Sequence, residues 1–199
     1  MFAVVSAIVE SQSQPESDTY LIGLCLKGHT QSFGRLYQRH QQKVRSTLYQ
    51  LCGADGLDDL VQEVFLRAWK GLTKFRQTAQ FTTWLYRITW NVASDRRRSY
   101  AQIRSRQVSV DDSQLQSIPS YGTETTNQLN TLHYQDLVQR GLAQLSSDHR
   151  SVLVLHDLEE LPQKEIAEIV GIPVGTVKSR LFHARAALKN FLDSQGVEL

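Results

Sequence analysis

The chain has 199 residues, a formal net charge of +2 and 21% charged residues. A soft prior of about 100 to 200 residues per domain allows one large domain or two small ones. No apolar run approaches the ~18 residues of a membrane span, and the first nine residues lack the basic flank of a signal peptide. We therefore expect a soluble cytoplasmic protein without membrane insertion.

The chain contains two cysteines, Cys25 and Cys52. They cannot make a disulfide framework, and neither lies in a cluster with the spacing of metal ligands. We expect both to be buried apolar residues, and we expect no metal and no cofactor.

Charge and composition change along the chain. Residues 35–106 hold fourteen basic and five acidic residues, a net charge of +9, whereas residues 107–165 hold three and nine, a net charge of −6. Residues 107–130 are rich in small polar side chains, which cannot bury enough apolar area to fold. The pattern predicts an all-α protein, with two small helical domains joined by a flexible linker. The expected parts are a flexible N-terminal tail (1–17), a first helical domain (18–106), the linker (107–130) and a helix-turn-helix domain (131–195).

The C-terminal part has the signals of a helix-turn-helix. Pro162 should begin its first helix, because a proline at the first helical position gives up only an N–H that has no partner there. Gly171 follows the last apolar turn, where a left-handed residue is cheap only for glycine, and Pro173 restarts the chain. The second helix has an inward stripe at steps of four, three and four, formed by Val177, Leu181, Ala184 and Leu188.

The outer face of this second helix is cationic, which suits duplex DNA. Small donors and cations in its first half suit base edges in the major groove, and the later cations suit phosphates. An ordinary amphipathic helix with a solvated basic face is the alternative, but the turn, the spacing and the sign of the charge together favour DNA. The residues expected at DNA are Thr176, Lys178, Ser179, Arg180, Phe182, His183 and Arg185.

The first domain should contain an amphipathic helix over residues 57–72, with a wide apolar stripe and an acidic opposite side. The acidic side suits a basic protein surface. Carboxylates in a first helical turn also compensate the macrodipole, by about 0.3 to 1 kcal/mol, so the residues alone leave both interpretations open. The polar residues on this side are Asp58, Asp59, Gln62 and Glu63.

A second helix is expected over residues 81–98, with Phe81, Trp84, Leu85, Ile88 and Val92 at the spacing of a buried side. The side chains left for other surfaces are aromatic, amide, hydroxyl and arginine groups, which can stack on unpaired bases, read their edges and hold phosphates. Any one aromatic is more typical of a core than of a base platform, so this prediction depends on the whole set. These remaining residues are Thr82, Thr83, Tyr86, Arg87, Trp90, Asn91, Ser94, Arg97 and Arg98.

These segments, in this order, resemble an extracytoplasmic-function sigma factor of bacterial RNA polymerase. The resemblance covers the chain from about Tyr20 to Leu192. DDLVQEVFLRAW, which begins at Asp58, looks like the family's polymerase-binding helix, and FTTWLYRITWNVASDRRR, which begins at Phe81, looks like its minus-ten helix. Residues 145–188 look like region four, and a short linker replaces region three, as the family implies.

The resemblance implies partners and site residues. Asp58, Asp59, Gln62 and Glu63 would face the clamp helices of the beta-prime subunit of core RNA polymerase, and the beta flap would be a further contact. The linker, with its acidic residues at 111, 112 and 124, would thread toward the RNA exit path, and an anti-sigma factor would mask the protein until a signal arrives. The loop 75–80 would cradle a flipped base of the nontemplate strand. The implied minus-ten residues are Phe75, Gln77, Thr78, Thr82, Thr83, Trp84, Arg87, Asn91, Arg97 and Arg98, and the recognition helix would address the minus-thirty-five element.

The chain departs from the family pattern in three places. A Leu-Pro pair at residues 161–162 replaces the usual serine or threonine, so the reciprocal capping box with Glu165 is lost. Leu85 follows Trp84 where housekeeping relatives pair two tryptophans, which implies a smaller wedge. His183 stands where a basic residue is frequent.

Two other classes of protein fit parts of the sequence. A free-standing helix-turn-helix regulator would explain the C-terminal half, but it gives the acidic and aromatic helices no role. An enzyme acting on nucleic acid would use Asp58, Asp59 and Glu63 as metal ligands, yet the sequence offers no metal cluster, no phosphate-cradling loop and no visible nucleophile. We therefore expect a protein that is not an enzyme, and that depends on core polymerase for catalysis.

Overall fold

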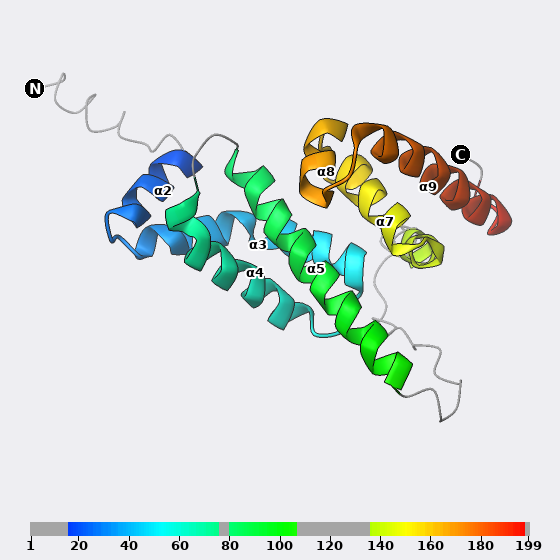
Figure 1. Ribbon diagram of the computed structural model, residues 1–199, viewed down its shortest axis with the longest axis horizontal. Helices are drawn as coiled ribbons and strands as arrows, with labels where there is room; N and C mark the ends of the chain where they lie inside the picture. The colour runs from blue at the N-terminus through cyan, green and yellow to red at the C-terminus, as the bar shows by residue number, and fades with distance from the viewer. Residues whose placement is uncertain (1–15, 76–79, 107–135, 198–199) are drawn as a thin grey trace, which may run out of the picture.

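The computed structural model describes residues 16–75, 80–106 and 136–197. Predictions for Gln77, Thr78, the linker 107–130 and most of the N-terminal tail lie outside the described residues. Within the described ranges the chain is helical and has no strand, which confirms the predicted all-α class (Figure 1). None of these helices is long and apolar enough to span a membrane.

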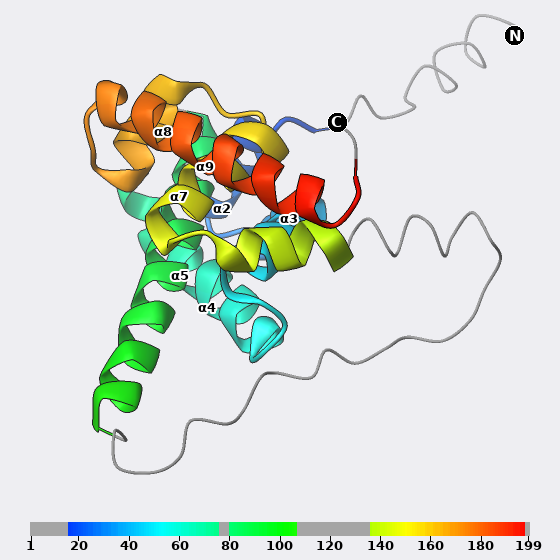
Figure 2. The ribbon, with the colours of Figure 1, turned by 90° about the vertical axis from the view of Figure 1, so that its right-hand side faces the viewer.

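The helices fall into two groups. The N-terminal helices are α2 (Asp18–Leu26), α3 (Gln31–Cys52), α4 (Leu57–Gly71), the short 3₁₀ turn η1 (Leu72–Lys74) and α5 (Phe81–Arg106). The C-terminal helices are a helical segment over residues 136–144, α7 (Ser147–Leu153), the π-helical turn η2 (Val154–Leu158), α8 (Gln163–Val170) and α9 (Val174–Ser194). Figure 2 shows the last turns of α5 extending away from both groups.

The N-terminal helices pack around one apolar core. Ser17 begins α2, because its side chain accepts a hydrogen bond from the Tyr20 N–H (3.2 Å) and so satisfies a donor at the helix start. Ser17 was expected in the flexible tail, but it caps the first helix. The predicted apolar stripe of α4 is confirmed, since all six of its members are buried: Leu57, Leu60, Val61, Val64, Phe65 and Ala68.

Helix α5 buries most of the predicted side and one residue that was not expected there. Phe81, Leu85 and Val92 are buried, and Trp84 is half-buried. Tyr86 was predicted to lie on another surface and this was wrong, because only 6% of it is exposed. It lies under the C-terminal helices, which cover a second side of α5.

The helix-turn-helix is formed by α8 and α9. Gly171 has φ 76° and ψ 37°, the left-handed conformation that the sequence predicts. Pro162 is not the first helical residue, because its ψ of 145° is extended; it is the N-cap, and its carbonyl accepts from the Ile166 N–H (3.1 Å). The inward stripe of α9 is confirmed for Val177, Leu181 and Ala184, which are at most 2% exposed, whereas Leu188 is half-buried.

The turn η2 connects α7 to the helix-turn-helix. The Glu159 N–H donates to the carbonyl of Val154 (3.1 Å), five residues earlier, so this turn is wider than an α-helical one. Glu160 follows with φ 56°, which is uncommon for a residue other than glycine. This geometry brings the Glu159 side chain toward the N-terminal helices.

The two cysteines lie in the N-terminal helices. Cys25 is buried, as predicted, and Cys52 is half-buried. Burial raises the pKa of both thiols, which favours the protonated, less reactive form.

Candidate nucleic-acid interface

The acidic face of α4 is open to solvent. Asp58, Asp59 and Gln62 are exposed, and the Asp58 carboxylate forms an ion pair with Arg45 of α3. Glu63 is half-exposed and accepts a hydrogen bond from Arg67 (2.7 Å). The predicted residues therefore share one accessible surface, with two of their carboxylates held in place by arginines.

Two apolar side chains extend this face beyond what the sequence analysis identified. Leu66 is 51% exposed and Trp69 is 39% exposed. Leu66 lies four residues after Gln62, so it falls on the same side of the helix. The sequence could have revealed this exposed leucine, because Leu66 does not belong to the predicted apolar stripe of α4. Trp69 contacts Phe33 with ring centroids 4.9 Å apart, which fixes the ring at the edge of the face.

An aromatic cluster and a pocket lie where α5 begins. The Trp84 ring is 5.0 Å from that of Phe75 and 5.7 Å from that of Phe81. Trp84 also lies against Gly71, where an added Cβ would come within 3.1 Å of its ring. A pocket of about 410 Å³ opens beside this cluster, and its lining is Asp18, Thr19, Ile22, Arg39, Phe75, Gln80, Phe81 and Thr82.

The pocket has polar groups as well as aromatic rings. Arg39 donates to the Asp18 carboxylate (2.5 Å), whose second oxygen lies 2.8 Å from Nε2 of the buried His40. These residues come from α2 and α3, and the sequence analysis did not include them. No local pattern reveals them, because only the tertiary fold brings α2 next to the start of α5.

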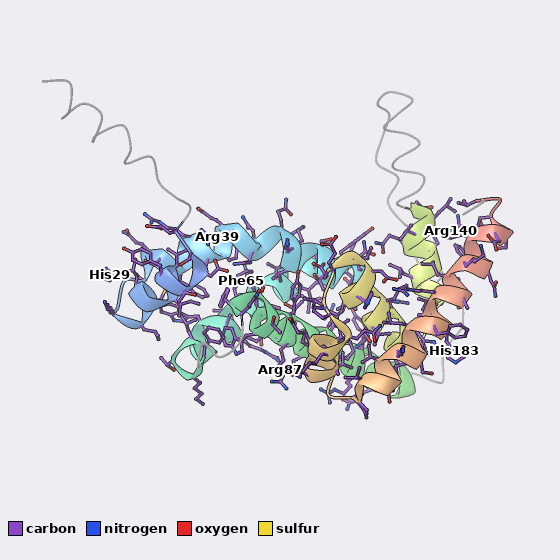
Figure 3. All side chains as sticks on the ribbon, turned by 90° about the horizontal axis from the view of Figure 1, so that it is seen from above. His29, Arg39, Phe65, Arg87, Arg140 and His183 are labelled. Carbon is purple, nitrogen blue, oxygen red and sulfur yellow. The ribbon has the colours of Figure 1, made fainter. Side chains whose placement is uncertain are left out.

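The predicted polar residues further along α5 do not all face the same way. Thr83 and Arg87 point to the C-terminal helices: Thr83 Oγ1 donates to Glu165 Oε2 (2.6 Å), and Arg87 donates to the Glu168 carbonyl (3.0 Å). Figure 3 shows Arg87 beside α8, the helix that contains Glu168. Asn91 is exposed. The sequence could only predict these side chains as one set, but in the structure Thr83 and Arg87 contact α8 while Asn91 faces solvent.

The two predicted arginines that follow Asn91, Arg97 and Arg98, differ in their exposure to solvent. Arg98 is exposed and forms an ion pair with Asp95 (2.6 Å). Arg97 is half-buried, and its guanidinium lies 4.6 Å from the centre of the Trp90 ring. Burial lowers the pKa of Arg97. Arg98 is therefore the more accessible of the two for a phosphate.

Helix α9 presents the predicted recognition residues on its outer side. Lys178, Ser179 and His183 are exposed, and Phe182 is 70% exposed. Thr176, at the start of the helix, is half-exposed. A large apolar side chain that stays in solvent beside cations suits a groove that presents thymine methyl groups and phosphates.

Two arginines of this helix are paired with acids of the preceding elements. Arg180 forms an ion pair with Asp148 of α7 (2.6 Å). Arg185 donates to both carboxylate oxygens of Asp157, with its Nε at 2.9 Å from Oδ2. The bonds from Arg185 hold the pKa of Asp157 below its usual value. These pairs fix α9 to the rest of the C-terminal helices.

His183 has an aromatic neighbour on α7. Its ring stacks on that of His149, with centroids 6.2 Å apart, and it forms a T-shaped pair with the Phe182 ring, with centroids 5.4 Å apart. Figure 3 shows His183 on the outer side of α9. The side chain is thus oriented by contacts from two elements.

The carboxylates of α4 do not form a metal site. Within residues 16–75, 80–106 and 136–197, no group of three or more histidine, cysteine, aspartate or glutamate side chains is arranged to hold a metal ion. The alternative that uses Asp58, Asp59 and Glu63 therefore has no support in the geometry of these residues.

Comparison with known proteins agrees with this arrangement. The model of sigma-70 region 2 matches residues 36–103, and that of sigma-70 region 4 matches residues 135–188. The region 2 match contains the acidic helix α4 and most of the aromatic helix α5, and the region 4 match contains the helix-turn-helix. Together they define the class of protein as a sigma factor.

Full-length relatives make the assignment more specific. The chain is 34% identical over 186 residues to the ECF RNA polymerase sigma-E factor of Escherichia coli (strain K12), which covers 89% of this chain and 95% of that protein. It is 30% identical over 182 residues to the sigma-E factor of Haemophilus influenzae, covering 87% and 94%. The chain belongs to the extracytoplasmic-function (ECF) family of RNA polymerase sigma factors.

Solved structures share the fold. The sigma factor RpoE of Bartonella quintana, crystallised with the anti-sigma factor NepR, matches with a TM-score of 0.65 and 24% identity, over 81% of this chain and 96% of that one. CnrH, in complex with the cytosolic domain of CnrY, matches with a TM-score of 0.61 and 24% identity, over 87% and 96%.

Proposed function

We propose that this sigma factor binds core RNA polymerase through the acidic face of α4, recognises a two-element promoter and promotes its melting. The open carboxylates of Asp58, Asp59 and Glu63 suit the basic clamp helices of the beta-prime subunit. The exposed Leu66 and Trp69 add apolar area next to these charges, and tryptophan is one of the residues that supply most of the affinity of protein interfaces.

The observation that carries the melting role is the pocket at the start of α5. Flipping a base costs a few kcal/mol of unstacking, and stacking on an aromatic side chain returns about 1 to 3 kcal/mol per base. Phe75, Phe81 and Trp84 supply the aromatic surface, and the polar groups of Gln80 and Thr82 can read a base edge. A pocket of about 410 Å³ has room for one unpaired base.

The recognition helix α9 suits the minus-thirty-five element. Thr176, Lys178, Ser179 and His183 would contact base edges and phosphates in the major groove, together with the exposed ring of Phe182. Arg180 and Arg185 would act near phosphates while paired with acids. The beta flap of the polymerase is the proposed contact for the C-terminal helices.

Catalysis would come from core polymerase, so we propose that the chain itself is an initiation factor without enzymatic activity. The same function implies a cytoplasmic location. Two structural relatives were solved with anti-sigma partners, NepR and the cytosolic domain of CnrY. On that ground we propose an anti-sigma factor as a further partner of this chain.

The first test mixes the purified chain with bacterial core RNA polymerase and measures co-elution and run-off transcription from a randomised promoter library. Co-elution with initiation at one shared two-element sequence is the expected result. No association, together with tight and specific binding of the free chain to duplex DNA, would instead favour a free-standing regulator.

The minus-thirty-five assignment has its own test. The double variant Lys178→Ala with His183→Ala should change the preferred minus-thirty-five sequence in the same library. Lys189→Ala is the matched control, because Lys189 lies further along α9 and should affect affinity without changing the preference. An unaltered preference in the double variant would refute the assignment.

A further inference from the structure

Helix α7 adds a residue to the proposed DNA-reading face of α9. The His149 ring, on α7, lies nearly parallel to the His183 ring on α9, with centroids 6.2 Å and planes 25° apart. We infer that His149 is a positioning residue for the minus-thirty-five element, which holds the His183 imidazole in the orientation that reads a base edge. This inference rests on the proposed role of α9, and it extends that role to a residue outside the recognition helix.

The His183 ring is held by two neighbours. Offset-stacked and T-shaped pairs are the favoured arrangements of aromatic rings, at centroid distances of about 4.5 to 7 Å. His149 makes a stacked contact, and Phe182 makes a T-shaped one, with planes 78° apart. Phe182 is itself 70% exposed, whereas His149 is half-buried. His149 is therefore the better anchored of the two neighbours.

Both imidazoles keep their nitrogens available for a ligand. In the part of the chain that the structure describes, no hydrogen-bond partner contacts the ring nitrogens of His149 or His183. His40 and His156 differ, because a ring nitrogen of each lies within 2.8 Å of an aspartate carboxylate. A neutral imidazole has one donor and one acceptor nitrogen. The ring of His183 is thus fixed by its faces and edges while its hydrogen-bonding groups stay free.

The acid next to His149 is already paired with the same face of α9. Asp148 forms an ion pair with Arg180 (2.6 Å). Arg180 lies three residues before His183, which places both on one side of the helix. Two consecutive residues of α7 therefore contact two side chains of the reading face, so α7 orients this face as well as supporting the core beneath it.

The chemistry of the major groove indicates which base the pair selects. Guanine presents two acceptors there, N7 and O6, and a ring N–H of His183 can donate to either. A mobile side chain must be ordered when it binds, which lowers affinity about 2- to 10-fold for each side chain. The stack with His149 orders the ring before DNA arrives. We therefore expect a guanine preference at the position that His183 reads, and we expect its strength to depend on His149.

The test compares holoenzymes that core RNA polymerase forms with the full-length wild type and five variants. Three of them are His149→Ala, His183→Ala and the two combined. His149→Phe keeps a ring that can stack, and His29→Ala is the control, because it removes a histidine at the opposite end of the molecule from His183 (Figure 3). Each holoenzyme initiates on a promoter library randomised at the minus-thirty-five element, and the enrichment of each base at each position measures the preference.

We expect His183→Ala to remove the guanine preference at one position. His149→Ala should weaken the preference at that same position by about 2- to 10-fold. The combined variant should lose no more than His183→Ala, because His149 acts through His183 and the two effects are then not additive. His149→Phe should retain most of the preference, and His29→Ala should retain all of it.

An unchanged preference in His149→Ala would overturn the inference and leave the proposed role of α9 intact. Additive losses in the combined variant would also overturn it, because His149 would then contact DNA by itself. So would an equal loss of initiation on every sequence, which is the behaviour of a phosphate contact. If no holoenzyme forms, or if His183→Ala changes no preference, the proposed function fails at that step and the inference fails with it. The two failures are therefore distinguishable.

Discussion

The ion pairs of α9 predict how strongly its DNA binding depends on salt. Arg180 is paired with Asp148 and Arg185 with Asp157. A carboxylate next to a guanidinium repels a phosphate and offsets part of the attraction of the cation. Replacing both acids, as Asp148→Asn with Asp157→Asn, should therefore make binding to duplex DNA tighter at low salt and more sensitive to salt.

The size of the effect follows from the number of cations available. Among the described residues, Lys178 and Lys189 are the cations of α9 without an acidic partner. With a slope of about −0.9 per neutralised phosphate, two cations lose about 12-fold in affinity between 50 and 200 mM salt, whereas four lose about 150-fold. The wild type should show the first value and the double asparagine variant should approach the second.

The assay is an anisotropy titration of a labelled duplex with the full-length chain at several salt concentrations. Asp193→Asn is the control, because Asp193 is an exposed acid of α9 that has no ion pair among the described residues. Circular dichroism verifies that each variant keeps its helical content. If the double asparagine variant has the same slope as the wild type, the acids do not mask Arg180 and Arg185, and the reasoning is refuted.

Three further predictions concern the other sites. Reversing the charge of Asp58, Asp59 and Glu63 together should abolish co-elution with core polymerase at unchanged helical content; retained co-elution would remove the α4 assignment. Trp84→Ala should leave the closed promoter complex intact but reduce melting by about 5- to 150-fold, the value of one stacked base, and a permanganate footprint with open thymines as in the wild type would contradict this. The lowered pKa of Asp157 means that its contribution to stability is complete above about pH 4 and is lost as the pH falls through its folded-state value. The difference in unfolding free energy between the wild type and Asp157→Asn should therefore shrink in urea titrations below about pH 4, and a constant difference would count against the pairing.

Local features could be predicted from the sequence because their causes are local. The apolar stripe of α4 follows from a helical period within one segment, and all its members are buried. Gly171 adopts the left-handed conformation that ends α8, since the turn after it requires one. The acidic face of α4 follows from the same period, so its exposure was predictable even though its partner was not.

Contacts between distant segments could not be predicted in this way. Tyr86 was expected on an outer surface. Its hydroxyl instead donates a hydrogen bond to the carboxylate of Glu159, seventy-three residues later, and the C-terminal helices bury its ring. The acids that pair with Arg180 and Arg185 lie on other elements of the helix-turn-helix region, so no spacing within α9 reveals them. The lining of the pocket likewise needs Asp18 and Arg39 from helices far from residue 81 in sequence.

The π-helical turn η2 also determines the direction in which the side chains of the residues after it point. A turn with one residue more than α-helical spacing rotates the next segment by about 100° about the helix axis, the angle of one residue. Deleting one residue between Val154 and Leu158 would restore α-helical spacing and turn the Glu159 carboxylate away from Thr47. The number of residues in this short stretch therefore decides which side chain faces Thr47 and Tyr86.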